Sequence, residues 1–363
     1  MNMHGGDVWQ VADELGTTAD HLLDFSANIN PRGLPVQALL KLARDAANPQ
    51  LLSFYPDSAA RKLRLALTEH TGVPGENLVI GPGAEALLSP ILRALRIRRL
   101  LVPVPAFSEY RRVCEQQNVH YVPFPLHHAD AFHLPVEHLC RRLEDESFDG
   151  VLLNSPHNPS GSMLEKDEVL RVLEVANASG AALILDEAFI DFVPGNSLIA
   201  ETSHRRGLVV LRSLTKFFGC PALRVGYAAA HPEVARHIAG LLPTWPITQL
   251  ALDALCEALA DRNYAEDTLR DNAANRAELA AALCSLGLTV FPSVANYLLL
   301  ELKPGMPSAE TLRTRMIRNH HILIRNCDSY EGLTHGHFIR VSVRTTEDNA
   351  RLAAALGQEL KQA

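Results

Sequence analysis

One lysine and one aspartate follow apolar, strand-like runs thirty residues apart, and together they could perform imine chemistry on an amine. Lys216 lies in the run from Val210 to Arg224, and Asp186 closes the run Ala-Ala-Leu-Ile-Leu-Asp. A lysine amine can condense with an aldehyde, while a carboxylate can keep a pyridine nitrogen protonated so that the ring accepts electrons. The pair therefore predicts pyridoxal 5′-phosphate as cofactor, with Lys216 and Asp186 as catalytic residues.

The phosphate of such a cofactor has candidate ligands beside the lysine and in a glycine-rich turn. Ser213 offers a hydroxyl and Arg224 a bidentate guanidinium. The run Gly81-Pro-Gly-Ala-Glu85 precedes an apolar helical pattern, and glycines let backbone N–H groups approach an anion at a helix N-terminus. Most glycine-rich turns bind no ligand, so the prediction for this turn depends on its combination with Lys216 and the residues around it. We expect phosphate contacts from Gly83, Ala84, Glu85, Ser213 and Arg224.

Two further residues could contact the cofactor ring. Asn158 lies in the run Asn154-Ser-Pro-His-Asn-Pro-Ser-Gly161, which two prolines and a glycine stiffen, and its amide could donate to the phenolate oxygen. Phe107, in Pro105-Ala-Phe-Ser-Glu-Tyr110, could stack on the pyridine face. An isolated phenylalanine is more often a core residue, so the prediction for Phe107 is the weaker one.

The elements that must position these groups alternate between short apolar runs and amphipathic stretches from about residue 36 to 235. This alternation predicts an α/β fold, with a mostly parallel seven-stranded sheet flanked by helices. The expected strands cover residues 78–80, 100–103, 120–122, 150–154, 182–185, 209–211 and 225–228. The candidate site residues follow the carboxyl ends of these strands, where open α/β sheets bind ligands.

The rest of the chain predicts an arm and a second domain. We expect an N-terminal arm over residues 1–35 that packs with the small domain and active site, and a large cofactor-binding domain over 36–240. Residues 241–363 would form an interdomain helix and a small α+β domain. One helical pattern runs from about 247 to 286, and strands are expected near 296–301, 322–324 and 338–343.

Composition favours a cytoplasmic enzyme with a small-molecule substrate. The net charge of −7 gives no reason to expect nucleic acid or an anionic membrane as partner. The six cysteines are scattered without a C-x-x-C pair, and the N-terminus lacks a signal-peptide pattern. The histidine pairs at 127–128 and 320–321 lack the spacing of metal ligands, so we expect no metal site.

These residues together resemble the fold-type I pyridoxal-phosphate enzymes of the aminotransferase superfamily, over the whole chain. The resemblance implies that Lys216 carries the cofactor and that Asp186 faces its ring nitrogen. It also implies a homodimer with shared active sites, in which Tyr55 reaches the neighbouring subunit's cofactor phosphate. Phe189 stands where many relatives carry a tyrosine that contacts the cofactor oxygen, so Asn158 must supply that contact alone.

Seven further motifs narrow the resemblance. They are His4-Gly-Gly6, Leu23-Asp-Phe-Ser-Ala-Asn-Ile-Asn-Pro31, Asp186-Glu-Ala-Phe-Ile-Asp-Phe192, Arg212-Ser-Leu-Thr-Lys-Phe217, Ala295-Asn-Tyr-Leu-Leu-Leu300, Ile322-Leu-Ile-Arg325 and Arg340-Val-Ser-Val-Arg344. With them the chain is most similar to the L-threonine-O-3-phosphate decarboxylase family of cobalamin biosynthesis, close to the histidinol-phosphate aminotransferases. That similarity implies substrate contacts from His4, Gly5, Asn28, Asn158, Arg325 and Arg340.

The implied substrate carries a carboxylate and a phosphate, so two arginines suit it: Arg340 for the carboxylate and Arg325 near the phosphate. His4 and the Gly5 N–H could complete the phosphate cradle. The implied reaction is pyridoxal-phosphate-dependent decarboxylation to (R)-1-amino-2-propanol O-2-phosphate, the work of a carboxy-lyase.

Two alternatives stay open. A histidinol-phosphate aminotransferase, or a related phospho-amino-acid aminotransferase, uses the same cofactor residues and also binds a phosphate-bearing amine. A non-catalytic, pyridoxal-phosphate-binding regulatory domain is a third possibility. The intact set of lysine, acid and arginine argues against it.

Overall fold

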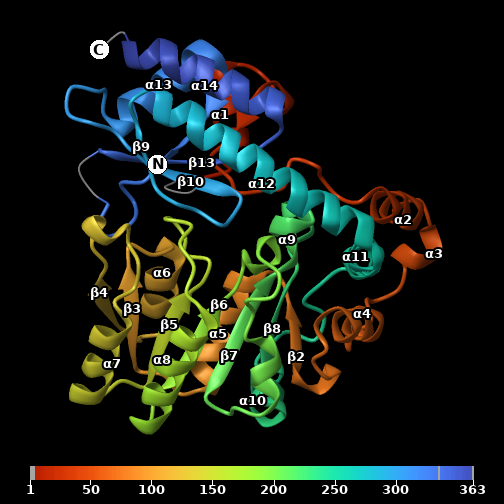
Figure 1. Cartoon of the computed structure of the whole chain (residues 1–363). Coiled ribbons are helices and arrows are strands. Elements are labelled where there is room, and N and C mark those ends of the chain that lie inside the picture. The colour runs from red at the N-terminus through yellow and green to blue at the C-terminus, as the bar shows by residue number, and fades with distance from the viewer. Residues whose placement is uncertain (1–4, 334–335, 362–363) are drawn as a thin grey trace.

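A seven-stranded sheet forms the larger part of the computed structural model, which describes residues 5–333 and 336–361 (Figure 1). Its order is β2-β8-β7-β6-β5-β3-β4. Strand β8 runs antiparallel to both neighbours, and the other strand pairs are parallel. The prediction of a mostly parallel sheet is confirmed. The strands are β2 (Leu78–Gly81), β3 (Arg99–Val104), β4 (His120–Pro125), β5 (Gly150–Asn154), β6 (Ala182–Asp186), β7 (Leu208–Ser213) and β8 (Gly226–Ala230).

Both faces of this sheet are buried, because alternate strand residues enter opposite cores. In β6, Leu183 and Leu185 pack with one set of helices and Ile184 packs with the other. The first set comprises α4 (Arg61–Thr71), α7 (Val136–Asp145), α8 (Lys166–Ala178) and α11 (Gln249–Ala260). The second comprises α5 (Ala84–Ala94), α6 (Ser108–Gln116) and α10 (Pro232–Ala239).

A smaller antiparallel sheet lies above the carboxyl ends of the large sheet (Figure 1). Its order is β12-β13-β10-β9, with β9 (Thr289–Val290), β10 (Tyr297–Glu301), β12 (Arg325–Asn326) and β13 (Phe338–Ser342). Helices α12 (Arg262–Ser285), α13 (Ala309–His320) and α14 (Thr346–Lys361) share its apolar core. The two sheets thus face each other across the edge where the candidate site residues were expected.

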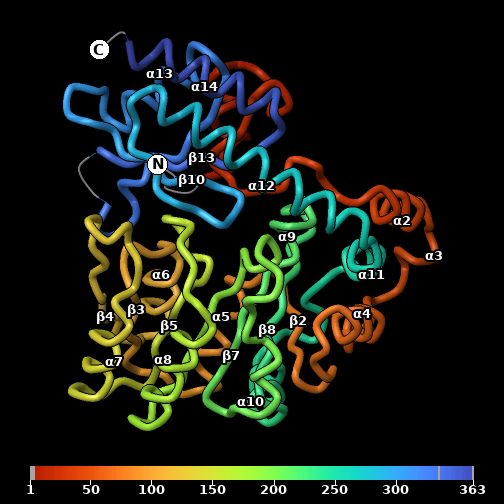
Figure 2. Tube along the Cα trace, in the orientation of Figure 1, coloured from red at the N-terminus to blue at the C-terminus, as the bar shows by residue number. Residues whose placement is uncertain are grey.

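The N-terminal arm joins this upper part. Strand β1 (Leu23–Asp24) pairs in parallel with β11 (Ile322–Leu323), and α1 (Val8–Leu15) packs on α13 and β11. In Figure 2 the red N-terminal trace accordingly lies among the blue C-terminal segments. The remaining helices are α2 (Val36–Ala46), α3 (Pro49–Leu52), α9 (Leu214–Phe217) and six short 3-10 turns at Ala19–His21, Gly75–Asn77, His128–Asp130, Ile190–Phe192, Ile199–Ser203 and Pro221–Leu223.

The helical pattern expected over 247–286 forms two helices rather than one. Asp261 ends α11, and its carboxylate accepts a hydrogen bond from the Tyr264 N–H (2.9 Å), which caps the start of α12. Helix α11 packs with the core of the large sheet, whereas α12 continues to the small one. The boundaries near residues 35 and 240 stay predictions. Among the described residues, no helix has the length and apolarity that crossing a membrane requires.

Candidate active site

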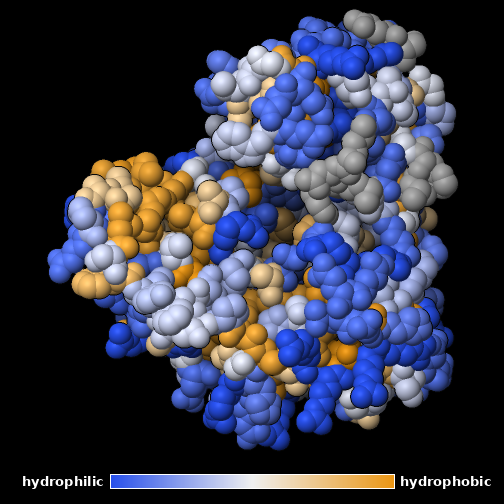
Figure 3. All heavy atoms as spheres, turned by 180° about the vertical axis from the view of Figure 1, so that it is seen from behind, coloured by the Kyte–Doolittle hydropathy of each residue, from blue (hydrophilic) through white to orange (hydrophobic). Residues whose placement is uncertain are grey.

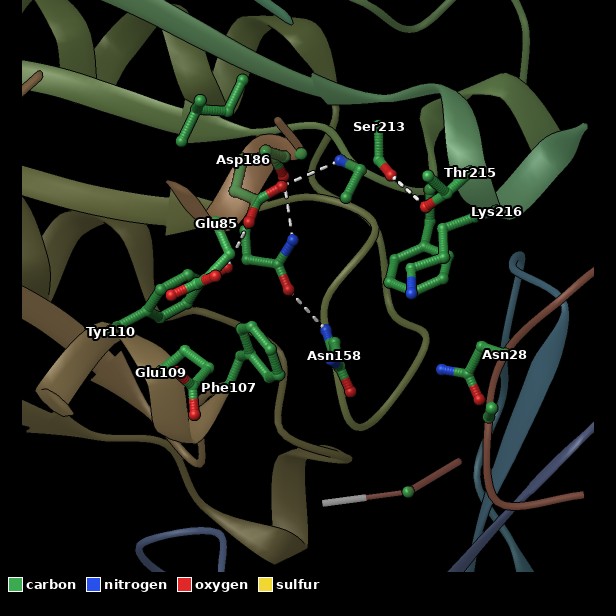
Figure 4. Close-up of a pocket in the computed structure, with 18 of the residues that line it drawn as sticks. Asn28, Glu85, Phe107, Glu109, Tyr110, Asn158, Asp186, Ser213, Thr215 and Lys216 are labelled. Atoms are coloured by element: carbon green, nitrogen blue, oxygen red, sulfur yellow. Dashed lines mark hydrogen bonds between the residues drawn. The ribbon is translucent and has the colours of Figure 1, made fainter. Parts of the chain in front are cut away.

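The carboxyl ends of β2, β3, β5, β6 and β7 surround one cavity of about 270 Å³, and residues of the arm, such as Asn28, and of β12 and β13 also line it (Figure 4). Most of the candidate residues line it: Gly5, Asn28, Gly83, Ala84, Glu85, Phe107, Asn158, Asp186, Ser213, Lys216, Arg224, Arg325 and Arg340. Tyr55 does not line it, and His4 lies outside the described residues. The structure therefore brings together side chains that are more than 300 residues apart.

Lys216 lies in α9, which begins where β7 ends and carries the lysine into the cavity. Burial, together with the nearby charges of Arg224 and Arg340, lowers the pKa of Lys216 to about 8, although Asp186 acts in the opposite direction. A lysine must be neutral to attack an aldehyde. This environment makes neutral Lys216 available near physiological pH.

Asp186 ends β6, and both of its oxygens accept hydrogen bonds. Oδ1 accepts from the Ala188 N–H (2.9 Å), and Oδ2 accepts from the Tyr110 hydroxyl (2.6 Å). Burial raises the pKa of Asp186, while these two donors and Lys216 favour its charged form. The carboxylate is thus fixed in direction and suits a protonated ring nitrogen.

Another group of lining residues suits a phosphate. Gly83 has φ 102° and precedes α5, and a Cβ there would lie 3.0 Å from Arg224 Nη2. Gly226 of β8 lies so close beneath this turn that a Cβ would overlap the backbone. The hydroxyls of Ser213 and Thr215 are 2.9 Å apart beside it. Glycine at positions 83 and 226 therefore lets backbone N–H groups, two hydroxyls and one guanidinium converge on an anion.

Ala84 and Glu85 open α5, whose first N–H groups have no partner within the helix. The Glu85 carboxylate is ion-paired with Arg112 Nη2 (2.7 Å). Its contribution to phosphate binding would therefore come from the backbone and not from the side chain.

Asn158 is oriented by two donors. Its Oδ1 accepts from the Tyr330 hydroxyl (3.0 Å) and from Arg340 Nη1 (2.5 Å). With the oxygen held in this way, the amide N–H₂ group is the part of Asn158 left to donate into the cavity. Phe107 lines the same cavity and packs edge-to-face on Tyr110, with ring centroids 5.7 Å apart. Stacking of Phe107 on a cofactor stays a prediction.

Arg325 and Arg340 are partners across β12 and β13 and are 7% and 5% exposed. Arg325 donates to the Ser329 hydroxyl (2.6 Å), and Arg340 donates to the Ser26 carbonyl (2.9 Å). Both Nε atoms are buried without a partner. Over residues 5–333 and 336–361, neither guanidinium forms an ion pair. Two buried positive charges beside one cavity call for an anionic ligand, because unpaired buried charge is costly.

The arm closes the cavity near these arginines. Asn28 is buried, and its Oδ1 has no partner. Gly5 lies so close to the Ser26 carbonyl that a Cβ would overlap it, and the neighbouring Gly6 N–H donates to the Ser26 hydroxyl (2.8 Å). The arm therefore presents backbone and amide groups to whatever the arginines bind.

Tyr55 lies elsewhere, between α3 and α4. It is 78% exposed, and its ring stacks on that of Trp245 at 4.3 Å between centroids. Within its own chain Tyr55 is thus remote from the cavity, and its predicted role requires a second subunit.

Four lining or supporting residues were not predicted: Tyr110, Thr215, Gly226 and Tyr330. The first two lie within motifs already singled out, Tyr110 three residues after Phe107 and Thr215 beside Lys216. Gly226 follows Arg224 by two residues, and a glycine inside a strand pattern signals a close approach. Tyr330 lies in an irregular segment after β12, where no periodicity indicates which way a side chain points.

Comparison with known proteins agrees with this geometry. Residues 20–356 match the family described as aminotransferase class I and II. A threonine-phosphate decarboxylase from Salmonella typhimurium is 34% identical over 97% of this chain and 95% of its own length. An adenosylcobalamin biosynthesis bifunctional protein from Leptospira interrogans is 28% identical over 97% of this chain, which spans 40% of that protein. The solved histidinol-phosphate aminotransferase from Clostridium acetobutylicum superposes with a TM-score of 0.85 at 28% identity, over 94% of this chain and 100% of its own.

Proposed function

The chain belongs to the aminotransferase class I and II family, and we propose on that premise that it decarboxylates O-phospho-L-threonine to (R)-1-amino-2-propanol O-2-phosphate. The observation that carries the proposal is the pair of buried arginines, Arg325 and Arg340, without an acidic partner in the described parts of the chain. The similarity to a threonine-phosphate decarboxylase supports the reaction, and the similarity to an adenosylcobalamin biosynthesis protein supports its place in making the cobalamin nucleotide loop.

The cofactor is pyridoxal 5′-phosphate, and the cavity fits it. Lys216 would hold it covalently, Asp186 would face the ring nitrogen, and Asn158 would donate to the ring oxygen. The turn at Gly83 and the Arg224 guanidinium would hold the phosphate. Arg224 Nη2 lies close enough to the turn that a Cβ at position 83 would be 3.0 Å from it, and the positive φ of Gly83 also favours glycine there. When bound, this cofactor supplies an electron sink for the pair left by a bond broken at the substrate's Cα.

The chain's own residues then orient the substrate. Arg340 would hold the carboxylate, and its direction is set by Asn158, Tyr330 and the Ser26 carbonyl. Arg325 would hold the phosphate, with Asn28 and Gly5 of the arm on the same side of the cavity. Because Arg340 is fixed by these contacts, it would hold the substrate carboxylate in one direction, and that direction would decide which bond at Cα gives its electron pair to the bound cofactor. Lys216, with a pKa of about 8, can hold or deliver a proton at Nζ.

We also propose a homodimer in which Tyr55 reaches the neighbouring subunit's cofactor phosphate. Large apolar side chains are exposed over α2, α3 and the following segment, where the left of Figure 3 is orange: Val36, Leu39, Leu40, Leu52 and Phe54. Tyr55 follows Phe54, and its exposed ring is stacked on that of Trp245. An apolar area of this kind is typical of an interface. Light scattering should give twice the chain mass, and a Lys216→Ala subunit mixed with a Tyr55→Phe subunit should regain activity.

A cytoplasmic location is proposed on different grounds. All six cysteines are free, and four of them are buried. Free thiols are typical of proteins from reducing compartments.

The reaction is tested by offering the enzyme O-phospho-L-threonine together with 2-oxoglutarate. The proposal predicts carbon dioxide release and no glutamate. Glutamate formation, above all from histidinol phosphate, would assign the enzyme to the aminotransferases instead. Cofactor binding without turnover of either substrate would favour a regulatory domain.

A further inference from the structure

The short helix that carries Lys216 is held at its C-terminal end by residues of two distant segments. The Asn30 N–H donates to the Lys216 carbonyl (3.1 Å), and Asn30 Nδ2 donates to the Phe217 carbonyl (2.8 Å). The same Nδ2 also contacts the Tyr264 hydroxyl (2.9 Å) and Thr268 Oγ1 (3.1 Å). Asn30 belongs to the arm, while Tyr264 and Thr268 belong to the first turns of α12.

These groups are buried and lie within hydrogen-bond distance of one another. Asn30, Tyr264 and Thr268 are 5%, 8% and 2% exposed. The Tyr264 hydroxyl lies 2.7 Å from the Gly33 carbonyl and 3.1 Å from the Phe217 carbonyl, to either of which it can donate. Gly219 approaches the Gly33 backbone so closely that a Cβ would lie 2.7 Å from it. The arm is thus pressed against the turn that follows Lys216.

Helix α9 needs such support because it has only four residues. A helix of one turn is not stable by itself, and its last carbonyls have no partner within the helix. Here the carbonyls of Lys216 and Phe217 find their donors on the arm and on α12. The backbone position of the lysine therefore depends on these contacts and not on α9 alone.

The same contacts connect Lys216 to the substrate side of the cavity. Two and four residues before Asn30, the arm presents Asn28 to the cavity and the Ser26 carbonyl to Arg340. From Tyr264 and Thr268, α12 continues into the core of the small sheet. One junction therefore joins the lysine, the arm and the interdomain helix.

We propose that Asn30, Tyr264 and Thr268 are positioning residues that hold Lys216 for its reaction and tie it to the arm and to α12. None of the three lines the cavity that contains Lys216. The inference rests on the proposed role of Lys216 as the cofactor lysine and is independent of whether the reaction is decarboxylation or transamination.

The test compares Tyr264→Phe with Thr202→Val. Thr202 is fully buried and donates one hydrogen bond to a backbone carbonyl (Ile199, 2.6 Å), but it does not line the cavity. Both variants lose one buried hydroxyl, so both should lower the melting temperature of the cofactor-free protein. Only Tyr264→Phe should raise the dissociation constant for pyridoxal phosphate, by about tenfold. It should also lower the fraction of bound cofactor that is covalently linked, read from the visible absorption and from borohydride labelling.

A second pair keeps the test decisive if Tyr264→Phe folds poorly. Thr268→Ser retains the hydroxyl and should keep wild-type cofactor affinity and linkage, whereas Thr268→Val should lose both. Unchanged affinity and linkage in Tyr264→Phe and Thr268→Val would overturn the proposal, as would an equal loss in Thr202→Val. Cofactor affinity and covalent linkage are measured without substrate. A wild-type enzyme that links its cofactor but releases no carbon dioxide would therefore refute the decarboxylase assignment and leave the proposal for Asn30, Tyr264 and Thr268 intact.

Discussion

The two walls of the cavity differ in how completely their polar groups are satisfied. On the wall formed by the large sheet, Asp186 has two donors and Ser213 shares a hydrogen bond with Thr215. On the wall formed by the arm and the small sheet, Arg325 and Arg340 have buried nitrogens without partners and no acid beside them in the described residues. On the first wall the Asp186 carboxylate is hydrogen-bonded as folded, and the turn at Gly83 with Arg224 suits the cofactor phosphate. The second wall requires an anionic ligand for its two buried guanidinium groups.

The difference indicates where common chemistry and individual specificity reside. The wall formed by the large sheet, which we call the cofactor wall, holds groups that suit the cofactor that the class I and II aminotransferase family has in common. The wall formed by the arm and the small sheet, which we call the substrate wall, holds groups that suit the substrate, and its two cations match a molecule with two anionic ends. Changes on the cofactor wall should abolish chemistry with any substrate. Changes on the substrate wall should alter which substrate is accepted and which bond at its Cα breaks.

The largest effect is expected from the cofactor wall, at Lys216. Lys216→Ala should lose at least about a thousandfold in kcat, because the residue both links the cofactor and carries a proton. It should still bind some pyridoxal phosphate without a covalent link. Borohydride should fix the cofactor on Lys216 in the wild type; labelling of Lys41, Lys62 or Lys166 instead would show the assignment to be wrong.

On the substrate wall, discrimination between phosphorylated and free threonine should be the largest effect. Free threonine leaves the Arg325 guanidinium buried and unpaired, so kcat/KM should fall by about a hundredfold or more. Arg325→Ala should remove most of that discrimination. Arg318→Ala is the control, because Arg318 lies exposed on the neighbouring α13. Comparable turnover of both substrates by the wild type would refute a phosphate site at Arg325.

Arg340→Lys tests whether the substrate wall also determines which bond at the substrate's Cα breaks. Lysine keeps the charge but loses the planar fork that contacts Asn158, Tyr330 and Ser26. Decarboxylation should fall by about 10- to 100-fold, with more Cα-proton exchange in deuterated water and more pyridoxamine phosphate. Undiminished carbon dioxide release without side products would mean that Arg340 does not set the geometry.

A smaller effect links the two walls through charge. Arg224 on the cofactor wall and Arg340 on the substrate wall both lower the pKa of Lys216, which is about 8. Because only neutral lysine attacks the aldehyde, the rate of cofactor rebinding to the stripped enzyme should rise about tenfold between about pH 7 and about pH 9 and then level off. A rate that keeps rising towards the ordinary lysine pKa would show that Lys216 is not perturbed.

Much of the cofactor wall could be predicted from the sequence, and the reason is topological. Parallel strands end at one edge of a sheet, so residues that follow them, such as Asp186 and Lys216, must meet there. Arg325 and Arg340 were predicted only through resemblance, since nothing in their strand pattern tells which face will meet the large sheet. Tyr330 and Asn30 act through hydrogen bonds to Asn158 and Tyr264, which lie about 170 and 230 residues from them in the sequence. Local periodicity does not encode contacts of this range.

The division of α11 from α12 at Asp261 differs, because a local signal is present in the sequence. Apolar spacing continues across the break and predicts one helix, but Asp261 caps the start of α12, and an aspartate is a favoured residue in that place. The two helices then continue into different cores. The roles of Tyr55 and His4 also stay predictions. Tyr55 needs a second subunit, and His4 lies outside the described residues.

The central claim, that one wall supplies general cofactor chemistry and the other directs it to decarboxylation, is tested most directly by turnover without any 2-oxo acid. An enzyme supplied only with carboxyl-labelled O-phospho-L-threonine and pyridoxal phosphate should release labelled carbon dioxide over many turnovers, with one aminopropanol phosphate formed for each. An aminotransferase would instead stop after one equivalent per site, leaving pyridoxamine phosphate and the label in the 2-oxo acid. That second result would contradict the account.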